Sequence, residues 1–192
     1  MAEKQVKQPT KLVVIGGSSG SLDALVTILP ALKKNFSIPV LLIIHRSNAA
    51  DSGLTDLLAS RTSLKIKEVD EKEYLQPGWI YLAPPDYHVL LEEDGSLSLD
   101  ASEKVFYCRP SIEVSFTSAA QAYGEACIAV LLSGANADGA AAMNKIKAMG
   151  GKTIVQDPAE AVVAYMPSQA IQLAAIDEIL PAAGIAAFLN TL

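Results

Sequence analysis

The chain has 192 residues, 51% of them hydrophobic and 6% aromatic, with a formal net charge of −6 at pH 7. This length predicts a single domain with a sizeable core, which we place at residues 11–192 behind a flexible tail at residues 1–10. The acidic balance argues against nucleic-acid binding, and the absence of a signal-peptide pattern or an apolar run of 18 residues predicts a cytoplasmic protein without membrane insertion.

The first part of the chain alternates apolar runs with helical patterns. Residues 11–16 and 40–45 read as buried strands, and each is followed by a helical segment, the second near residues 52–60. The helix after the first strand has an apolar stripe at helical spacing, which predicts its core-facing side. The residues of this stripe are Leu22, Leu25, Leu29 and Leu32.

The middle of the chain consists of short extended pieces. Asp94-Gly95 lies between the last two of them and is a strong hairpin signal. We therefore expect a small antiparallel edge in this region rather than a separate domain. The pieces are residues 64–69, 78–83, 87–92 and 96–99.

Strand and helix patterns alternate again in the last part. Ser111 can cap a helix that runs to about Tyr123, where Gly124 stops it. The alternation predicts an α/β fold: a doubly wound, mostly parallel sheet with helices on both faces, in three layers. The remaining expected elements are strands at 126–132 and 152–156, and helices at 139–149, 167–175 and 180–192.

The segment Gly16-Gly17-Ser18-Ser19-Gly20 fits the spacing G-x-S-x-G between the first strand and its helix. A serine on such a turn exposes its hydroxyl, and the first amides of the helix can stabilise an oxyanion beside it. Turns of this composition also cradle phosphates at helix N-termini. The segment therefore predicts either a nucleophilic serine at position 18 or a phosphate- or nucleotide-binding loop over residues 16–21.

Three reactive side chains fall at the carboxyl ends of predicted strands, where open parallel sheets bind ligands. Ser18 follows the first strand, His45 ends the second, and Asp138 follows the strand at 126–132. A serine needs a base to take its proton, and an imidazole oriented by a carboxylate supplies one. Asp157 also follows a strand and remains an alternative to Asp138. The order Ser, His, Asp differs from that of α/β-hydrolases.

The other residues capable of such chemistry have simpler interpretations. His88 starts an extended piece and is interpreted as a structural or rim residue. Cys108 and Cys127 form no metal-binding spacing and no disulfide framework, and Cys127 lies in a buried apolar run. No metal and no organic cofactor are expected.

With these residues in view, the chain resembles the catalytic domain of chemotaxis protein-glutamate methylesterases, the CheB family, from about Leu12 to Leu189. Six ordered motifs carry the resemblance. They are Val14-Ile15-Gly16-Gly17-Ser18-Ser19-Gly20, Ile44-His45, Leu82-Ala83-Pro84-Pro85-Asp86-Tyr87-His88, Arg109-Pro110-Ser111-Ile112-Glu113-Val114, Leu132-Ser133-Gly134-Ala135-Asn136-Ala137-Asp138-Gly139-Ala140 and Tyr165-Met166-Pro167.

The resemblance implies a serine esterase that demethylates glutamate γ-methyl esters on helical cytoplasmic segments of chemoreceptors and can deamidate glutamines. It places the nucleophile on Ser18, the base on His45 and the acid on Asp138 rather than Asp157. It also implies an oxyanion hole formed by the backbone amides of Ser19 and Ala135. Arg109 and Met166 are candidate cleft residues.

Two departures from the family pattern bear on function. The acid loop is often Gly-x-Gly-x-Asp-Gly, and here Asn136 replaces the second glycine; asparagine tolerates positive φ, so we expect the loop to keep its shape. The family's phosphorylatable receiver domain has no counterpart in these residues. The expected regulatory partners are therefore a separate or fused receiver domain or a methyltransferase, and an esterase acting outside chemotaxis remains an alternative.

Overall fold

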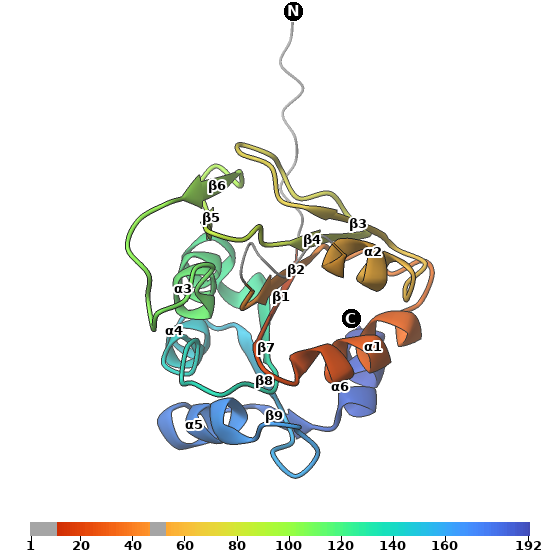
Figure 1. Ribbon diagram of the computed structural model, residues 1–192, viewed down its shortest axis with the longest axis vertical. Coiled ribbons are helices and arrows are strands. Elements are labelled where there is room, and N and C mark those ends of the chain that lie inside the picture. The colour runs from red at the N-terminus through yellow and green to blue at the C-terminus, as the bar shows by residue number, and fades with distance from the viewer. Residues whose placement is uncertain (1–10, 47–52) are drawn as a thin grey trace, which may run out of the picture.

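The computed structural model describes residues 11–46 and 53–192. Its main sheet has seven parallel strands in the order β3-β4-β2-β1-β7-β8-β9, with helices on both faces (Figure 1). The predicted fold class is therefore confirmed. The predicted tail at residues 1–10 and the predicted helix start at Ser52 lie outside the described residues. The main-sheet strands are β1 Leu12–Gly17, β2 Val40–Ile44, β3 Lys65–Glu68, β4 Trp79–Leu82, β7 Cys127–Leu131, β8 Lys152–Gln156 and β9 Glu178–Leu180.

The helices form two layers around the sheet, as Figure 1 shows. Helices α3, α4 and α5 cover one face, and α1, α2 and α6 cover the other. None of the helices in the described part of the chain has the length and apolar character needed to cross a membrane. Their bounds are α1 Ser21–Ala31, α2 Leu54–Ala59, α3 Ile112–Tyr123, α4 Ala142–Ala148, α5 Tyr165–Leu173 and α6 Ala182–Leu189, with a short 3-10 turn η1 at Gly124–Ala126.

Strand β1 lies at the centre of the sheet between β2 and β7. All six of its residues are buried, as expected for a strand covered on both faces. Its register pairs Gly17 with Ile44 of β2 and Gly16 with Leu131 of β7. The three strands therefore end side by side, and the loops that follow them meet at one edge.

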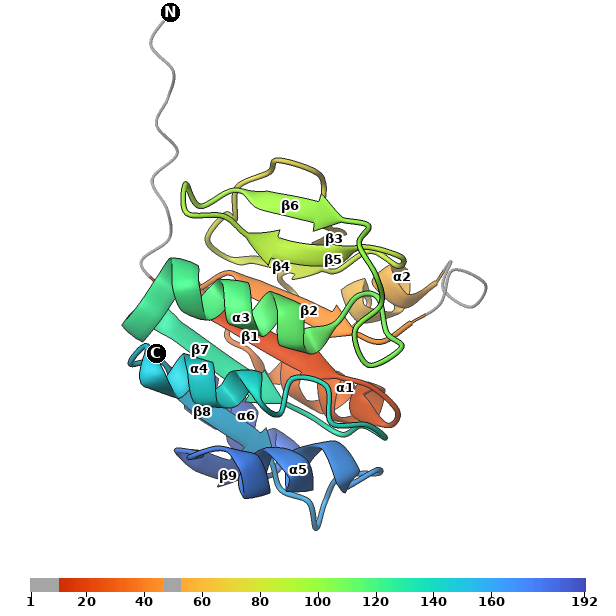
Figure 2. The ribbon, with the colours of Figure 1, turned by 90° about the vertical axis from the view of Figure 1, so that its left-hand side faces the viewer.

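The middle of the chain differs in part from its prediction. The hairpin is confirmed, because β5 (His88–Leu91) and β6 (Leu97–Asp100) pair antiparallel as a separate two-stranded sheet (Figure 2). The prediction was wrong for β3 and β4, which pair parallel to each other and extend the main sheet beyond β2. Short extended segments have the same sequence pattern whether they pair parallel or antiparallel, because the direction of pairing depends on the connections between them.

Two further sequence expectations need correction. The final segment is not helical from position 180, because Glu178–Leu180 forms strand β9 beside β8. Leu22 does not face the core, since the residue is 37% exposed. In the first turn of α1 the buried position belongs to Ser21, whose hydroxyl donates to the carbonyl of Ser18. The core-facing side of α1 contains Ala24, Leu25, Ile28 and Leu29.

Gly16 is required by close packing between β1 and α3. A Cβ atom at this position would lie 2.4 Å from Cγ2 of Ile112 and 3.1 Å from Cζ of Phe116. We expect Gly16→Ala to lower the free energy of unfolding by about 1–3 kcal/mol, as overpacking does in other cores. Urea denaturation measures the loss. Gly53→Ala is the control, because among the described residues no atom lies within 4 Å of its added Cβ; equal losses for the two variants would contradict the packing argument.

Candidate active site

The loop after β1 fixes the peptide around Ser18. The amide of Ser18 donates to the carbonyl of Ser133 at 2.9 Å, and the carbonyl of Ser18 accepts from the amide and hydroxyl of Ser21. Gly20 precedes α1 with a φ of 79°, a conformation that favours glycine. These bonds use only main-chain atoms of Ser18, so they hold its position and leave its hydroxyl uncommitted.

Ser18 and His45 occupy neighbouring positions at the ends of β1 and β2. The amide of His45 donates to the carbonyl of Gly17 at 3.1 Å, which continues the parallel ladder by one residue. On β1, Val14 and Gly16 face α3, and on β2, Leu41 and Ile43 do the same. Because side chains alternate along a strand, Ser18 and His45 follow onto this same face.

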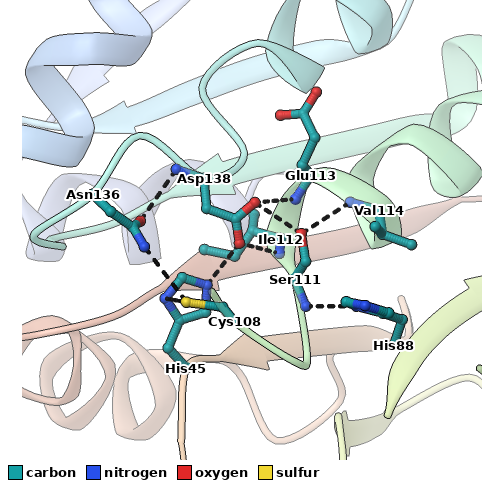
Figure 3. Close-up of polar contacts among 9 residues, drawn as sticks. All are labelled: His45, His88, Cys108, Ser111, Ile112, Glu113, Val114, Asn136 and Asp138. Atoms are coloured by element: carbon teal, nitrogen blue, oxygen red, sulfur yellow. Dashed lines mark hydrogen bonds and ion pairs between the residues drawn. The ribbon is translucent and has the colours of Figure 1, made fainter. Parts of the chain in front are cut away.

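Asp138 contacts the imidazole from the loop between β7 and α4. Its Oδ2 lies 2.7 Å from Nε2 of His45, and the aspartate is fully buried (Figure 3). Ionised carboxylates only accept hydrogen bonds, so Nε2 carries the proton of this contact. Nδ1 is then the unprotonated imidazole nitrogen, whose lone pair can accept a hydrogen bond. Among the predicted site residues, the structure thus joins His45 to Asp138.

The N-terminus of α3 holds the Asp138 carboxylate in place. Oδ1 accepts from the hydroxyl of Ser111 and the amide of Glu113, both at 2.9 Å, and Oδ2 also accepts from the amide of Ile112 at 2.7 Å. Helix N-termini favour negative charge, because their first amides lack partners within the helix. This explains how a fully buried carboxylate is stabilised.

His88 accepts a hydrogen bond from the backbone of Ser111, which is consistent with a structural role. The amide of Ser111 donates to Nδ1 of His88 at 3.1 Å, so the other ring nitrogen donates to the carbonyl of Glu103 at 3.0 Å. The imidazole is fully buried with both nitrogens used. His88 therefore fixes the helix end that receives Asp138.

The rival acid, Asp157, lies elsewhere. Its carboxylate accepts from the amide of Ala159 at 2.9 Å, and its own amide donates to the carbonyl of Leu180. These contacts cap the turn after β8. Of the two aspartates, only Asp138 is within hydrogen-bond distance of His45.

The amides of Ser19 and Ala135 are free to bind a ligand. Within residues 11–46 and 53–192 neither N–H donates to a protein acceptor, and both residues are exposed. They lie in adjacent loops, since the bond from Ser18 to Ser133 and the bond from the Ser133 hydroxyl to the carbonyl of Ser19 join the two segments. The pair is suited to an oxyanion hole.

A cavity of about 310 Å³ opens beside His45. Arg109, one of the two predicted cleft residues, lines this cavity and donates from its guanidinium to the carbonyls of Ala101 and Ser102. Met166, the other, is fully buried against Gly134, and its amide donates to the Gly134 carbonyl. The residues lining the cavity are His45, Arg46, Asp86, Lys104, Tyr107, Cys108 and Arg109.

Cys108 and Asn136 complete the surroundings of the imidazole. Sγ of Cys108 lies 3.4 Å from Nδ1 of His45, and the side-chain amide of Asn136 donates to this sulfur at 3.5 Å (Figure 3). Sequence reasoning missed both contacts. The available signals were a thiol next to a functional motif and the asparagine side chain at the loop position where the resemblance implied glycine.

The two cysteines are both poor nucleophiles. Burial raises the pKa of the Cys108 thiol above its ordinary value, and the negative charge of Asp138 adds to this effect. Burial alone raises the pKa of Cys127 to about 12, in agreement with its prediction as a buried apolar residue. Both side chains are therefore thiols at neutral pH.

Glu113 gives the site a testable pH dependence. Burial raises the pKa of its carboxyl, opposed by a hydrogen bond from the amide of Ala142 and reinforced by Asp138. The folded state therefore binds the Glu113 proton more tightly than the unfolded state, and this contribution to stability declines as pH rises through the raised pKa. Glu113→Gln stays neutral, so its unfolding free energy should exceed that of the wild type by an amount that grows with pH.

Urea denaturation at about pH 4, below the ordinary pKa of a glutamate, and at about pH 8 measures this difference. Glu93→Gln, at an exposed position outside the site, is the control. A Glu113→Gln advantage that shrinks with rising pH would contradict the sign of the shift.

A parallel α/β sheet with a serine turn and a His–Asp contact at its carboxyl edge is the arrangement typical of a serine hydrolase. The family model for CheB methylesterase matches residues 13–189 of this chain. The chain belongs to the CheB methylesterase family.

Individual relatives agree with this assignment. A putative protein-glutamate methylesterase/protein-glutamine glutaminase of Leptospira interrogans is 42% identical over 168 residues, covering 88% of this chain and 87% of that protein. Protein-glutamate methylesterase FrzG of Myxococcus xanthus is 35% identical over 187 residues, 97% of this chain but 56% of that protein. The crystal structure of the Thermotoga maritima CheB methylesterase catalytic domain superposes with a TM-score of 0.90 at 35% identity, covering 97% of this chain and 99% of that one.

Proposed function

We propose that this protein is a serine esterase that hydrolyses glutamate γ-methyl esters and, by the same route, deamidates glutamine side chains. The observation that carries the proposal is the 2.7 Å contact between His45 and Asp138 at the sheet edge that also bears Ser18. Relatives with 42% and 35% identity are named for these activities or for the methylesterase alone. The proposed substrates are methylated helical cytoplasmic segments of chemoreceptors.

The proposed reaction begins with attack by Oγ of Ser18 on the ester carbonyl. Because Nε2 of His45 donates to Asp138, the hydroxyl proton goes to Nδ1. The buried carboxylate then stabilises the imidazolium that forms. The free amides of Ser19 and Ala135 donate to the developing oxyanion.

The second half of the proposed reaction regenerates the enzyme. The proton on Nδ1 passes to the leaving methoxide, and methanol departs from the acyl-enzyme. A water molecule gives a proton to Nδ1 and attacks the acyl carbonyl. Nδ1 then returns this proton to Oγ of Ser18 as the acyl bond breaks, which releases glutamate and restores the serine hydroxyl and the neutral imidazole. With a glutamine substrate, ammonia replaces methanol as the leaving group.

A combined labelling and turnover assay tests the proposal. The protein is treated with a fluorophosphonate, and the modified residue is located by mass spectrometry; methanol release is measured on methylated chemoreceptor segments. We expect an adduct on Ser18 and loss of methanol release in proportion to labelling. A phosphate-binding module would give no adduct, and labelling without methanol release would indicate an esterase with another substrate.

Regulation and location are also proposals. We infer that activity is controlled by a receiver domain or a methyltransferase, and that the protein acts in the cytoplasm, where such receptor segments lie. Adding a phosphorylated receiver domain to the methanol-release assay tests this control directly.

A further inference from the structure

The imidazole nitrogen that must accept the serine proton is bonded to a thiol in this structure. Nδ1 of His45 contacts Sγ of Cys108 at 3.4 Å, within the range for a sulfur hydrogen bond. Among residues 11–46 and 53–192 the hydroxyl of Ser18 makes no hydrogen bond. Because Nδ1 has no proton in the tautomer that Asp138 selects, the thiol is the donor.

Asn136 connects this thiol to the acid loop. Its Nδ2 donates to Sγ of Cys108 at 3.5 Å, and its Oδ1 accepts from the amide of Asp138 at 3.2 Å. Together with the bond from His45 to Asp138, these contacts form a closed ring of four residues (Figure 3). A glycine at position 136 would have no side chain to make either contact.

We propose that Cys108 and Asn136 are positioning residues that hold the His45 imidazole with Nδ1 unprotonated and directed into the site until Ser18 takes the place of the thiol. This inference rests on the proposed function, because it assigns Nδ1 the role of base. Asn136 directs the thiol, and the thiol orients the ring.

A thiol suits this role because it is a weak donor. It can keep the acceptor nitrogen occupied, and a serine hydroxyl can displace it at little cost. His45 and Cys108 both line the cavity beside the imidazole, and the sulfur occupies the position next to Nδ1. Without the sulfur, water from the cavity would reach Nδ1 and compete with Ser18 as a stronger donor. The raised pKa of Cys108 keeps the group protonated, so it can donate rather than attack.

Three variants test the role of the thiol in turnover. A hydrogen bond contributes about 0.5–1.5 kcal/mol, which corresponds to roughly a two- to tenfold change in rate. We expect Cys108→Ala to lower kcat by such a factor with KM unchanged. We expect Cys108→Ser to recover only part of the loss, because its hydroxyl orients the ring again but is a stronger donor that Ser18 must displace. Cys127→Ala, a thiol deletion in the core, is the matched control for kcat. An unchanged or raised kcat in Cys108→Ala would overturn the proposal.

A double-mutant cycle tests whether Asn136 acts through Cys108. Asn136→Gly should lower kcat in the wild-type background and have a smaller effect in Cys108→Ala, where the shared contact is already lost. Additive effects would show that the two residues act separately and would overturn the ring as a unit. Tm is measured for each variant, because a merely structural role would couple the pair in stability and not in kcat.

Nuclear magnetic resonance provides a readout that does not depend on activity. The chain has only two histidines, so the ring nitrogens of His45 can be distinguished from those of His88. In the uniformly 15N-labelled protein, Cys108→Ala should shift the Nδ1 resonance of His45 and leave His88 unchanged. An unshifted resonance would overturn the contact whatever the activity. Absence of wild-type methanol release would instead defeat the proposed function, and the spectra would still decide whether Cys108 holds Nδ1.

Discussion

Replacing Ser18 with alanine is expected to lower kcat for ester hydrolysis by roughly 10⁴-fold or more while leaving the fold intact. The loss follows from removal of the only atom proposed to bond covalently to the substrate. The fold should persist because, within the described residues, the hydrogen bonds of Ser18 use its amide and carbonyl, which alanine retains. Methanol release measures the first effect, and thermal unfolding measures the second, with a stability change within about 0.5 kcal/mol.

Ser19→Ala is the matched control for this variant. The exposed side chain of Ser19 is adjacent in the chain, and alanine keeps the backbone amide proposed for the oxyanion hole. We expect Ser19→Ala to retain kcat near the wild-type value. If Ser18→Ala kept full activity, the nucleophile would have to be assigned to another residue.

The second large effect is expected for Asp138→Asn, which should reduce both kcat and stability. Four donors converge on the carboxylate, from His45, Ser111, Ile112 and Glu113. Oδ1 accepts from Ser111 and Glu113, and Oδ2 accepts from His45 and Ile112. An asparagine replaces one of these two oxygens with an NH2 group, which cannot accept a hydrogen bond. If it faces Ile112 and His45, the imidazole changes tautomer and Nδ1 becomes protonated, which would lower kcat by about 10⁴-fold.

Either orientation of this amide also leaves a buried backbone N–H without an acceptor, that of Ile112 or that of Glu113. Such a group costs about 1–3 kcal/mol of unfolding free energy. Kinetics together with urea denaturation separate the two effects. Asp157→Asn is the control, because its oxygen still accepts from Ala159. Normal turnover in Asp138→Asn and loss in Asp157→Asn would reverse the assignment of the acid.

Much of the fold follows from local sequence patterns. The continuous apolar run of β1 and its alternation with helices predict a strand buried on both faces. Ser111 and Gly124 bound α3 as predicted, with the Ser111 hydroxyl accepting from the amide of Val114. These signals work because capping and hydrophobic periodicity act within a few residues.

The elements that were predicted wrongly, in type or in pairing, lack such signals. Strand β9 has only three residues and none of them is buried. The sequence pattern therefore assigns the apolar end of this strand to the following helix. Strand β3, whose residues are charged or half-exposed, lies at the edge of the sheet, and its parallel pairing depends on the crossover to β4. Pairing direction is a property of the whole connection rather than of the strand itself.

The sequence by itself determined the fold class, the serine turn and the set of polar residues at strand ends, because chain direction and periodicity fix where each strand terminates. Only the tertiary structure decided that Asp138, 93 residues from His45, contacts Nε2, and that Cys108 and Asn136 surround Nδ1. The reason is physical, because burial of both sheet faces sets the strand order and brings distant loops together. A local sequence pattern does not determine which side chains of these loops come into contact.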